Sequence, residues 1–131
     1  MNIKYPLTPL ALLLPILTGC TGVIQAMPRD SGKVYSGEVF GNGFSSGSIT
    51  LPINGETYSG PIVSTDAGFG LIQRHGNSAS ASEFGGTRTV KGILSSPSGK
   101  GLRCEFTSNG LGGSGICIDD KQQIYDAIVH L

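Results

Sequence analysis

Three cysteines and two histidines are the residues of this 131-residue chain that offer the most varied chemistry. Thiolates and imidazoles bind metals, and closely spaced cysteine pairs carry out redox reactions. Cys104 and Cys117 lack the C-x-x-C spacing of redox motifs, and neither His75 nor His130 lies near a cysteine in the sequence. We therefore predict no metal site, no redox role and no cofactor, and we interpret both histidines as polar surface residues.

A serine within a hydrolase-like motif is a second candidate for chemistry. Residues 43–47 fit G-x-S-x-G around Ser45, a pattern that forms a nucleophile elbow when a strand precedes it and a helix follows it. The residues that follow here alternate as in a strand, which disfavours the elbow. We therefore predict that the protein is not an enzyme, and we keep a small hydrolase acting on peptidoglycan or lipid as a less favoured alternative.

Two further motifs occur in the last quarter of the chain. Residues 110–115 fit G-x-G-x-x-G, but a dinucleotide site also needs a following helix and a later acid. Residues 116–118 are instead typical of a strand, so the glycines are interpreted as the tip of a hairpin. Asp119 and Asp120 lack the order of acids in a calcium loop, and a polar hairpin turn is the better interpretation.

The N-terminal residues have the composition of an export signal. Lys4 is followed by an apolar run over residues 6–17, which is too short to span a bilayer but suits a signal peptide. The run ends in Leu17-Thr18-Gly19-Cys20, which resembles the lipobox of bacterial lipoproteins. This resemblance implies that residues 1–19 are removed and that Cys20 carries the lipid. Thr21, where an aspartate favours retention in the inner membrane, implies the outer membrane.

Cys104 and Cys117 remain once Cys20 is assigned to the lipid. In the oxidising cell envelope, two cysteines on neighbouring strands are expected to form a disulfide. Closing a loop of this size adds roughly 3 kcal/mol of stability by the loop-entropy estimate. We therefore predict a structural Cys104–Cys117 disulfide.

Composition and charge limit the fold and the partners. The chain holds 21 glycines and 7 prolines but no tryptophan, and its nine basic residues balance its nine acidic residues. This balance leaves no broad positive field for nucleic acid. We predict a lipidated N-terminus and tether over residues 20–33, followed by one Gly-rich β domain over residues 34–131, in which most glycines are turn residues.

Short alternating segments define the expected strands. Ile49, Leu51 and Ile53 alternate with polar residues, as in a half-buried strand. Asn54-Gly55 then predicts a type I′ hairpin turn. Residues 69–74 are a weaker strand candidate and residues 75–86 a loop. The other strand candidates are residues 34–40, 56–60, 87–94, 102–107, 115–119 and 124–131. We predict an all-β fold, an antiparallel sandwich or small barrel of seven or eight strands with one disulfide.

Two weaker resemblances extend over the mature chain. Tyr35-Ser36-Gly37 recurs as Tyr58-Ser59-Gly60, which resembles one unit of the MORN repeat. The wider outline, with Ser36-Gly37, the segment 103–106 and Tyr125, is similar to that of a group of small uncharacterised Gram-negative lipoproteins. Neither resemblance implies an activity.

Taken together, these features favour a non-enzymatic envelope lipoprotein. We expect a lipid anchor in the membrane, no nucleic-acid partner, and a disulfide-linked β domain that faces another envelope component. The alternative is an inhibitor or immunity-type module that binds a secreted enzyme.

Overall fold

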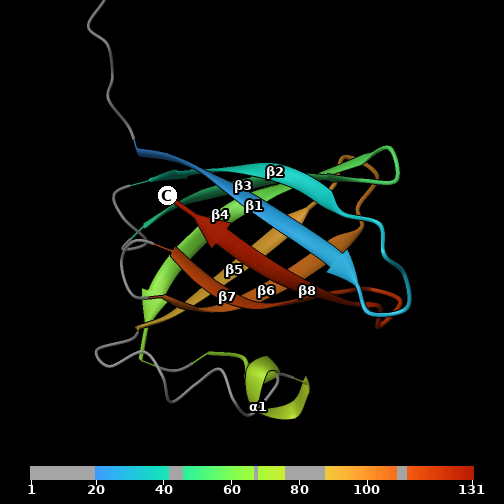
Figure 1. Ribbon diagram of the computed structural model, residues 1–131. Helices are drawn as coiled ribbons and strands as arrows, with labels where there is room; N and C mark the ends of the chain where they lie inside the picture. Colours follow the sequence, from blue (N-terminus) through green and yellow to red (C-terminus); the bar gives the residue numbers. More distant parts are fainter. Residues whose placement is uncertain (1–19, 42–45, 67, 76–87, 109–111) are drawn as a thin grey trace, which may run out of the picture.

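Eight antiparallel strands form a closed barrel in the computed structural model, which describes residues 20–41, 46–66, 68–75, 88–108 and 112–131 (Figure 1). Each strand pairs with its neighbours in the chain, and the barrel closes where the first strand pairs with the last. The strands are β1 (Cys20–Pro28), β2 (Tyr35–Gly41), β3 (Ser46–Ile53), β4 (Glu56–Thr65), β5 (Arg88–Ser95), β6 (Gly101–Ser108), β7 (Gly112–Asp119) and β8 (Ile124–His130). The prediction of an all-β fold is confirmed, and the fold is the barrel rather than the sandwich.

The apolar residues that alternate along the strands face the inside of the barrel. Phe106, Ile49 and Leu51 have no exposed surface and belong to one buried cluster to which all eight strands contribute. The residues that alternate with the core residues along each strand, such as Glu38 on β2 and Ile93 on β5, face outward and are exposed. An eight-stranded barrel is just wide enough for its own side chains to fill it, so the interior is a packed core.

The predicted disulfide joins two neighbouring strands. Cys104 on β6 lies opposite Cys117 on β7, their Cα atoms are 4.0 Å apart, and their sulfur atoms are bonded. Both residues are fully buried within the barrel core. The disulfide therefore crosslinks the core of the C-terminal half of the barrel.

The segment expected to be a tether is partly a strand, and this expectation was wrong for its first nine residues. β1 pairs with β2 on one side and with β8 on the other, and thereby closes the barrel. Gly22, Ile24 and Ala26 face the interior. Because two of these three inward residues are small, the alternation is weak in the sequence, and the composition resembles that of a linker.

The weak strand expected at residues 69–74 was also wrong. Leu71–His75 forms a short helix, α1, which lies outside the barrel against β6 and β7. The Arg74 N–H donates to the Gly70 carbonyl in a helical turn. Apolar residues at 69, 71 and 72 fit either a strand or one helical turn, so the local pattern does not distinguish them.

Glycine serves the strands as well as the turns, which the sequence interpretation underestimated. Gly112 and Gly113 were expected at a hairpin tip, but they lie within β7, and a Cβ on Gly113 would collide with the backbone carbonyl oxygen of Thr107. Glycines within strands let a sheet bend sharply enough to close. At the predicted Asn54-Gly55 turn, the φ angles are 51° and 79°, as a type I′ turn requires.

The two ends of the barrel differ. At the end where β1 begins, β8 ends at the C-terminus, because the two strands are antiparallel. At the other end, four short connections follow β1, β3, β5 and β7 (Figure 1). We call this second end, which lies farthest from Cys20, the distal end.

Candidate functional site

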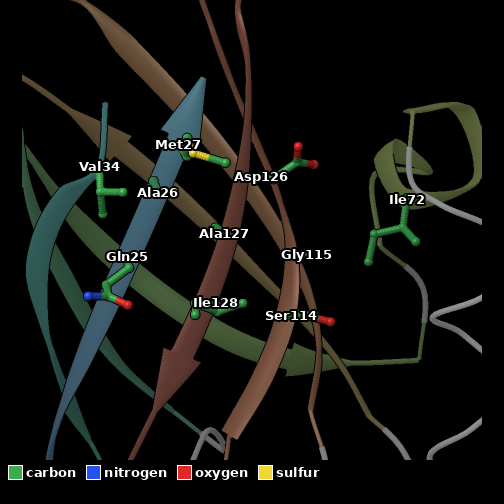
Figure 2. Close-up of a pocket in the computed structure, with 10 residues that line it drawn as sticks. All are labelled: Gln25, Ala26, Met27, Val34, Ile72, Ser114, Gly115, Asp126, Ala127 and Ile128. Carbon is green, nitrogen blue, oxygen red and sulfur yellow. The ribbon is translucent and has the colours of Figure 1, made fainter. Parts of the chain in front are cut away.

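A filled barrel must bind its ligands on its outer face or at its ends. Among the described residues, a hollow on the outer face and another at the distal end meet this condition. The first, which we call the outer groove, has a volume of about 350 Å³ (Figure 2). Its lining comes from β1, the β1–β2 connection, β7, β8 and α1: Gln25, Ala26, Met27, Val34, Ile72, Ser114, Gly115, Asp126, Ala127 and Ile128.

The outer groove crosses a row of small residues. Ala26 on β1 lies opposite Ala127 on β8, which in turn lies opposite Gly115 on β7. The outward-facing Met27 and Ile128 border this row and are 39% and 43% exposed. Because the side chains of Ala26 and Ala127 face the core, strand backbone forms the floor between these exposed apolar side chains, and an apolar group can lie on it.

Ile72 of α1 forms the wall of the outer groove opposite β1 (Figure 2). A single buried carboxylate fixes the start of this helix. Glu105 accepts a hydrogen bond of 2.6 Å from the Ile72 N–H and one of 3.2 Å from the Gly70 N–H. Hydrogen bonds to a charged acceptor contribute about 1.5–3 kcal/mol each, so this carboxylate is well suited to hold α1 in place.

Glu105 is an outward-facing residue that the α1 segment covers. It lies between the inward-facing Cys104 and Phe106, yet it is only 3% exposed. Its cross-strand neighbour Ile116 also lies outside the core cluster and is 2% exposed. On its other side Glu105 pairs with Lys91, whose ammonium group lies 5.2 Å from the centre of the Phe69 ring. These residues form a small second core between α1 and the barrel.

An ion pair stands at the rim of the outer groove. Arg29 Nη2 lies 3.0 Å from Asp126 Oδ1, and Arg29 Nε donates to both oxygens of the same carboxylate. Both side chains are substantially exposed, so the pair adds little stability. Because Arg29 binds the carboxylate through both Nε and Nη2, this bidentate contact fixes the position of the Asp126 carboxylate beside the recess.

The second hollow, the distal pocket, opens between the connections at the distal end and has a volume of about 340 Å³. It is more polar than the outer groove. Its lining residues are Ile53, Asn54, Glu56, Tyr58, Lys100, Asp119, Asp120, Lys121, Gln123 and Tyr125.

Tyrosines close the barrel beneath the distal pocket. The Tyr125 hydroxyl donates to Asp119 Oδ2 over 3.1 Å, and the Tyr35 hydroxyl donates to Asn54 Oδ1 over 2.7 Å. The rings of Tyr35 and Tyr125 meet edge to face with their centres 6.5 Å apart. Tyr58 is 7% exposed, and its hydroxyl has no hydrogen-bond partner within the described part of the chain.

The carboxylates around the distal pocket are held by the turns. Asp119 accepts hydrogen bonds from the N–H groups of Lys121 and Gln123, each over 2.9 Å. Asp120 accepts one from the Gly101 N–H over 2.7 Å. The bonds to Asp119 explain the polar turn predicted here, because an aspartate commonly closes a turn on its own backbone, whereas Asp120 links this turn to the start of β6.

Burial and charge shift the ionisation of the groups in the distal pocket. Burial, then the neighbouring Asp119 carboxylate, raises the pKa of Tyr125 and that of Tyr58. The hydrogen bond from Ser98, together with the nearby Lys100 ammonium group, lowers the pKa of Glu56. At neutral pH both tyrosines are therefore neutral and Glu56 is charged.

The residues singled out in the sequence lie apart from these hollows. Cys20 begins β1, and Cys104 and Cys117 lie in the core. His75 ends α1 and His130 ends β8, and within the described ranges neither histidine hydrogen-bonds to an acid. The candidate nucleophile Ser45 lies outside the described residues.

Two residues were not predicted: Glu105, which holds α1 at the outer groove, and Tyr58, which lines the distal pocket. Glu105 occupies an outward position that normally faces water, so the alternation of β6 hides its burial. Tyr58 was noted only as part of a Tyr-x-Gly repeat. Nothing in the sequence near Glu105 indicates that the α1 segment folds back onto it. In contrast, the position of Tyr35, Tyr58 and Tyr125 close to turns could have indicated a tyrosine cluster at one end of the barrel.

Comparisons with known proteins add no family assignment. No helix in the described residues is long and apolar enough to cross a membrane. In the same residues, no group of three His, Cys, Asp or Glu side chains is placed to hold a metal ion. No protein-family model matches the chain, and no curated protein matches it significantly.

Proposed function

We propose that this protein is a non-enzymatic lipoprotein of the cell envelope, anchored through Cys20, that holds an apolar segment of another envelope protein in its outer groove. The observation that supports this function best is the apolar recess on the outer face of a barrel whose interior is already filled. A recess of about 350 Å³ lies within the usual size range of binding clefts.

The start of β1 sets how far the outer groove lies from the lipid anchor. Cys20 is the first residue of β1, and the groove residues Gln25 and Met27 lie five and seven positions further along the same strand. At about 3.4 Å per residue, they lie roughly 17–24 Å from Cys20 along the strand. A lipid on Cys20 would therefore set the height of the outer groove above the bilayer, on the distal half of the barrel wall.

The lining of the groove favours a protein segment over a bare acyl chain. Gln25, Ser114 and Asp126 place an amide, a hydroxyl and a carboxylate beside the apolar recess. Such groups can hydrogen-bond to the backbone of a peptide, whereas an acyl chain offers them no partner. A closed barrel also has no free strand edge, so the partner cannot bind by adding a strand to the sheet.

Site-specific photo-crosslinking in cells tests the proposal. A photoreactive side chain at Ile128 on β8, in the groove, is compared with one at Ile93 on β5, which is three strands away and 56% exposed. We expect a discrete protein adduct from position 128 only, joined through an apolar segment of the partner. Met27→Asp should weaken this adduct at least about tenfold, because it removes apolar burial and adds a charge.

Three results would count against this function. An adduct with lipid alone would reassign the groove, equal adducts from both positions would show nonspecific contact, and an adduct unaffected by Met27→Asp would exclude the groove.

The anchor is tested separately by labelled palmitate, with Cys20→Ser as the control. Absence of label on the wild-type protein would overturn the proposed location in the envelope.

A further inference from the structure

Tyr58 carries an unusual polar group for a buried residue. The side chain is more than nine-tenths buried and belongs to the barrel core, yet it also lines the distal pocket. Its hydroxyl has no hydrogen-bond partner within the described part of the chain. No buried side-chain oxygen or nitrogen of the described residues lacks a partner, so this hydroxyl is the part of Tyr58 that solvent reaches, and it is open to a ligand that enters the pocket.

The polar groups that line the pocket with this hydroxyl include both donors and acceptors. The carboxylates of Glu56 and Asp120 accept hydrogen bonds, and the ammonium groups of Lys100 and Lys121 donate them. The amide of Gln123 does both. A ligand that satisfies them must itself carry several groups that donate and accept.

The charges in the distal pocket disfavour simple ions. Three carboxylates and two ammonium groups line it, so it does not strongly attract an anion. Its carboxylates already have partners, because Glu56 lies 3.6 Å from Lys100 and Asp120 accepts from the Gly101 N–H. A metal ion would have to displace these contacts, which leaves a neutral polar ligand as the best match.

We propose that the distal pocket binds a neutral saccharide unit, with the Tyr58 hydroxyl as the central hydrogen-bonding group. A pyranose ring has hydroxyl groups that donate and accept around its rim, and C–H groups on its faces. The hydroxyls match the polar side chains of the pocket, and the C–H groups match Ile53 and the tyrosine rings. A volume of about 340 Å³ is enough for one ring to enter.

This second site is independent of the outer groove. The distal pocket lies at the opposite end of the barrel from Cys20, between the connections that follow β3, β5 and β7. In the anchored protein it therefore faces away from the membrane. Loss of protein crosslinks from Ile128 would refute the groove and leave the saccharide site untouched.

Tyrosine fluorescence gives a direct measurement, because the chain has four tyrosines and no tryptophan. In full-length protein carrying Tyr5→Phe, the three remaining tyrosines, Tyr35, Tyr58 and Tyr125, all lie at the distal end. The protein is titrated, in a detergent without a sugar headgroup, with N,N′-diacetylchitobiose and with maltose. The first probe represents cell-wall glycans and the second represents glucans, so the two titrations distinguish the source of the saccharide.

The matched variants are Tyr58→Phe and Tyr35→Phe, each of which removes one hydroxyl and keeps the ring. Tyr58→Phe should weaken binding about three- to tenfold, the usual effect of one neutral hydrogen bond. Tyr35→Phe should change it less than twofold, because Tyr35 does not line the pocket and its hydroxyl is already bonded to Asn54. Thermal unfolding confirms that both variants fold.

Saturable binding of either disaccharide that Tyr58→Phe weakens and Tyr35→Phe does not would establish the site. Failure of both probes to bind would overturn the proposal, as would equal binding by the wild-type protein and Tyr58→Phe. Tighter binding of inorganic phosphate or of Ca²⁺ than of either sugar would overturn it as well. If Tyr58→Phe does not fold, Gln123→Ala supplies the second test, and unchanged sugar binding by that variant would also count against the site.

Discussion

Replacing Glu105 with glutamine tests whether one buried carboxylate holds α1, and with it the wall of the outer groove. Glutamine has nearly the same shape but only one acceptor oxygen, so its NH₂ group must face one of the two N–H groups that the carboxylate now binds. Either the Ile72 N–H or the Gly70 N–H then loses its acceptor. The perturbation is therefore confined to the contact between α1 and β6.

The magnitude follows from these two hydrogen bonds. Each bond to a charged acceptor contributes about 1.5–3 kcal/mol, and the gain from no longer burying a charge offsets part of the loss. We expect a net local destabilisation of about 1–3 kcal/mol. If opening of α1 exposes the Ile72 amide, its hydrogen exchange should accelerate roughly 5- to 150-fold.

The barrel itself should be much less affected. Glu105 and Ile116 lie outside the main core cluster, and the strands on either side keep all their pairings. The free energy of unfolding measured with urea should therefore fall by less than about 1 kcal/mol. A larger fall would show that α1 and the barrel unfold as one unit.

Residue-resolved hydrogen exchange is the appropriate assay, and Glu38→Gln is the matched control. Glu38 also faces outward from a strand, but it is exposed, and it should leave the Ile72 amide unchanged. If exchange at Ile72 in Glu105→Gln stays within twofold of the wild-type rate, the carboxylate does not hold the helix. The argument that it shapes the groove would then be wrong.

Three further perturbations test the barrel. Replacing Cys104 and Cys117 together by alanine should lower the free energy of unfolding by about 3 kcal/mol in urea titrations, because the closed loop has a sequence separation of 13. Gly115→Ala should lower the thermal midpoint by at least about 10 °C, because its Cβ would collide with the β6 backbone. Above about pH 10 the unfolded tyrosines ionise while Tyr58 and Tyr125 stay protonated in the fold. The free energy of unfolding should then fall by up to about 1.4 kcal/mol per pH unit for each of these two tyrosines. In Tyr125→Phe, which keeps only Tyr58, it should fall less steeply.

The parts of the fold that could be predicted are those set by neighbouring residues. Ile49, Leu51 and Ile53 alternate in the sequence, and all three face the core. The turn at Asn54-Gly55 depends on positive φ angles that these two residue types tolerate. Such features need no knowledge of the rest of the chain.

The features that escaped prediction all depend on distant partners. β1 is a strand because β8, about 100 residues later, supplies one of its two neighbours. Glu105 is buried because residues 68–72 fold back over β6. Gly115 is required because the neighbouring strand comes too close for a side chain. Local patterns carry no information about such encounters, which arise only when the sheet closes.

Closure of the sheet also determines where recognition can occur. A closed barrel with a packed interior offers neither a free edge nor an internal cavity, which leaves its outer face and its ends. β1 begins at Cys20 itself and spans nine residues, about 27 Å along the strand, or about 20 Å along the axis of a barrel with strands tilted by roughly 35–45°. A lipid on Cys20 would thus set both the height and the orientation of the barrel. The outer groove would open from the side of the barrel toward partners beside the protein, whereas the distal pocket would open away from the membrane. The two proposed sites consequently differ in the partners they can reach as well as in their chemistry.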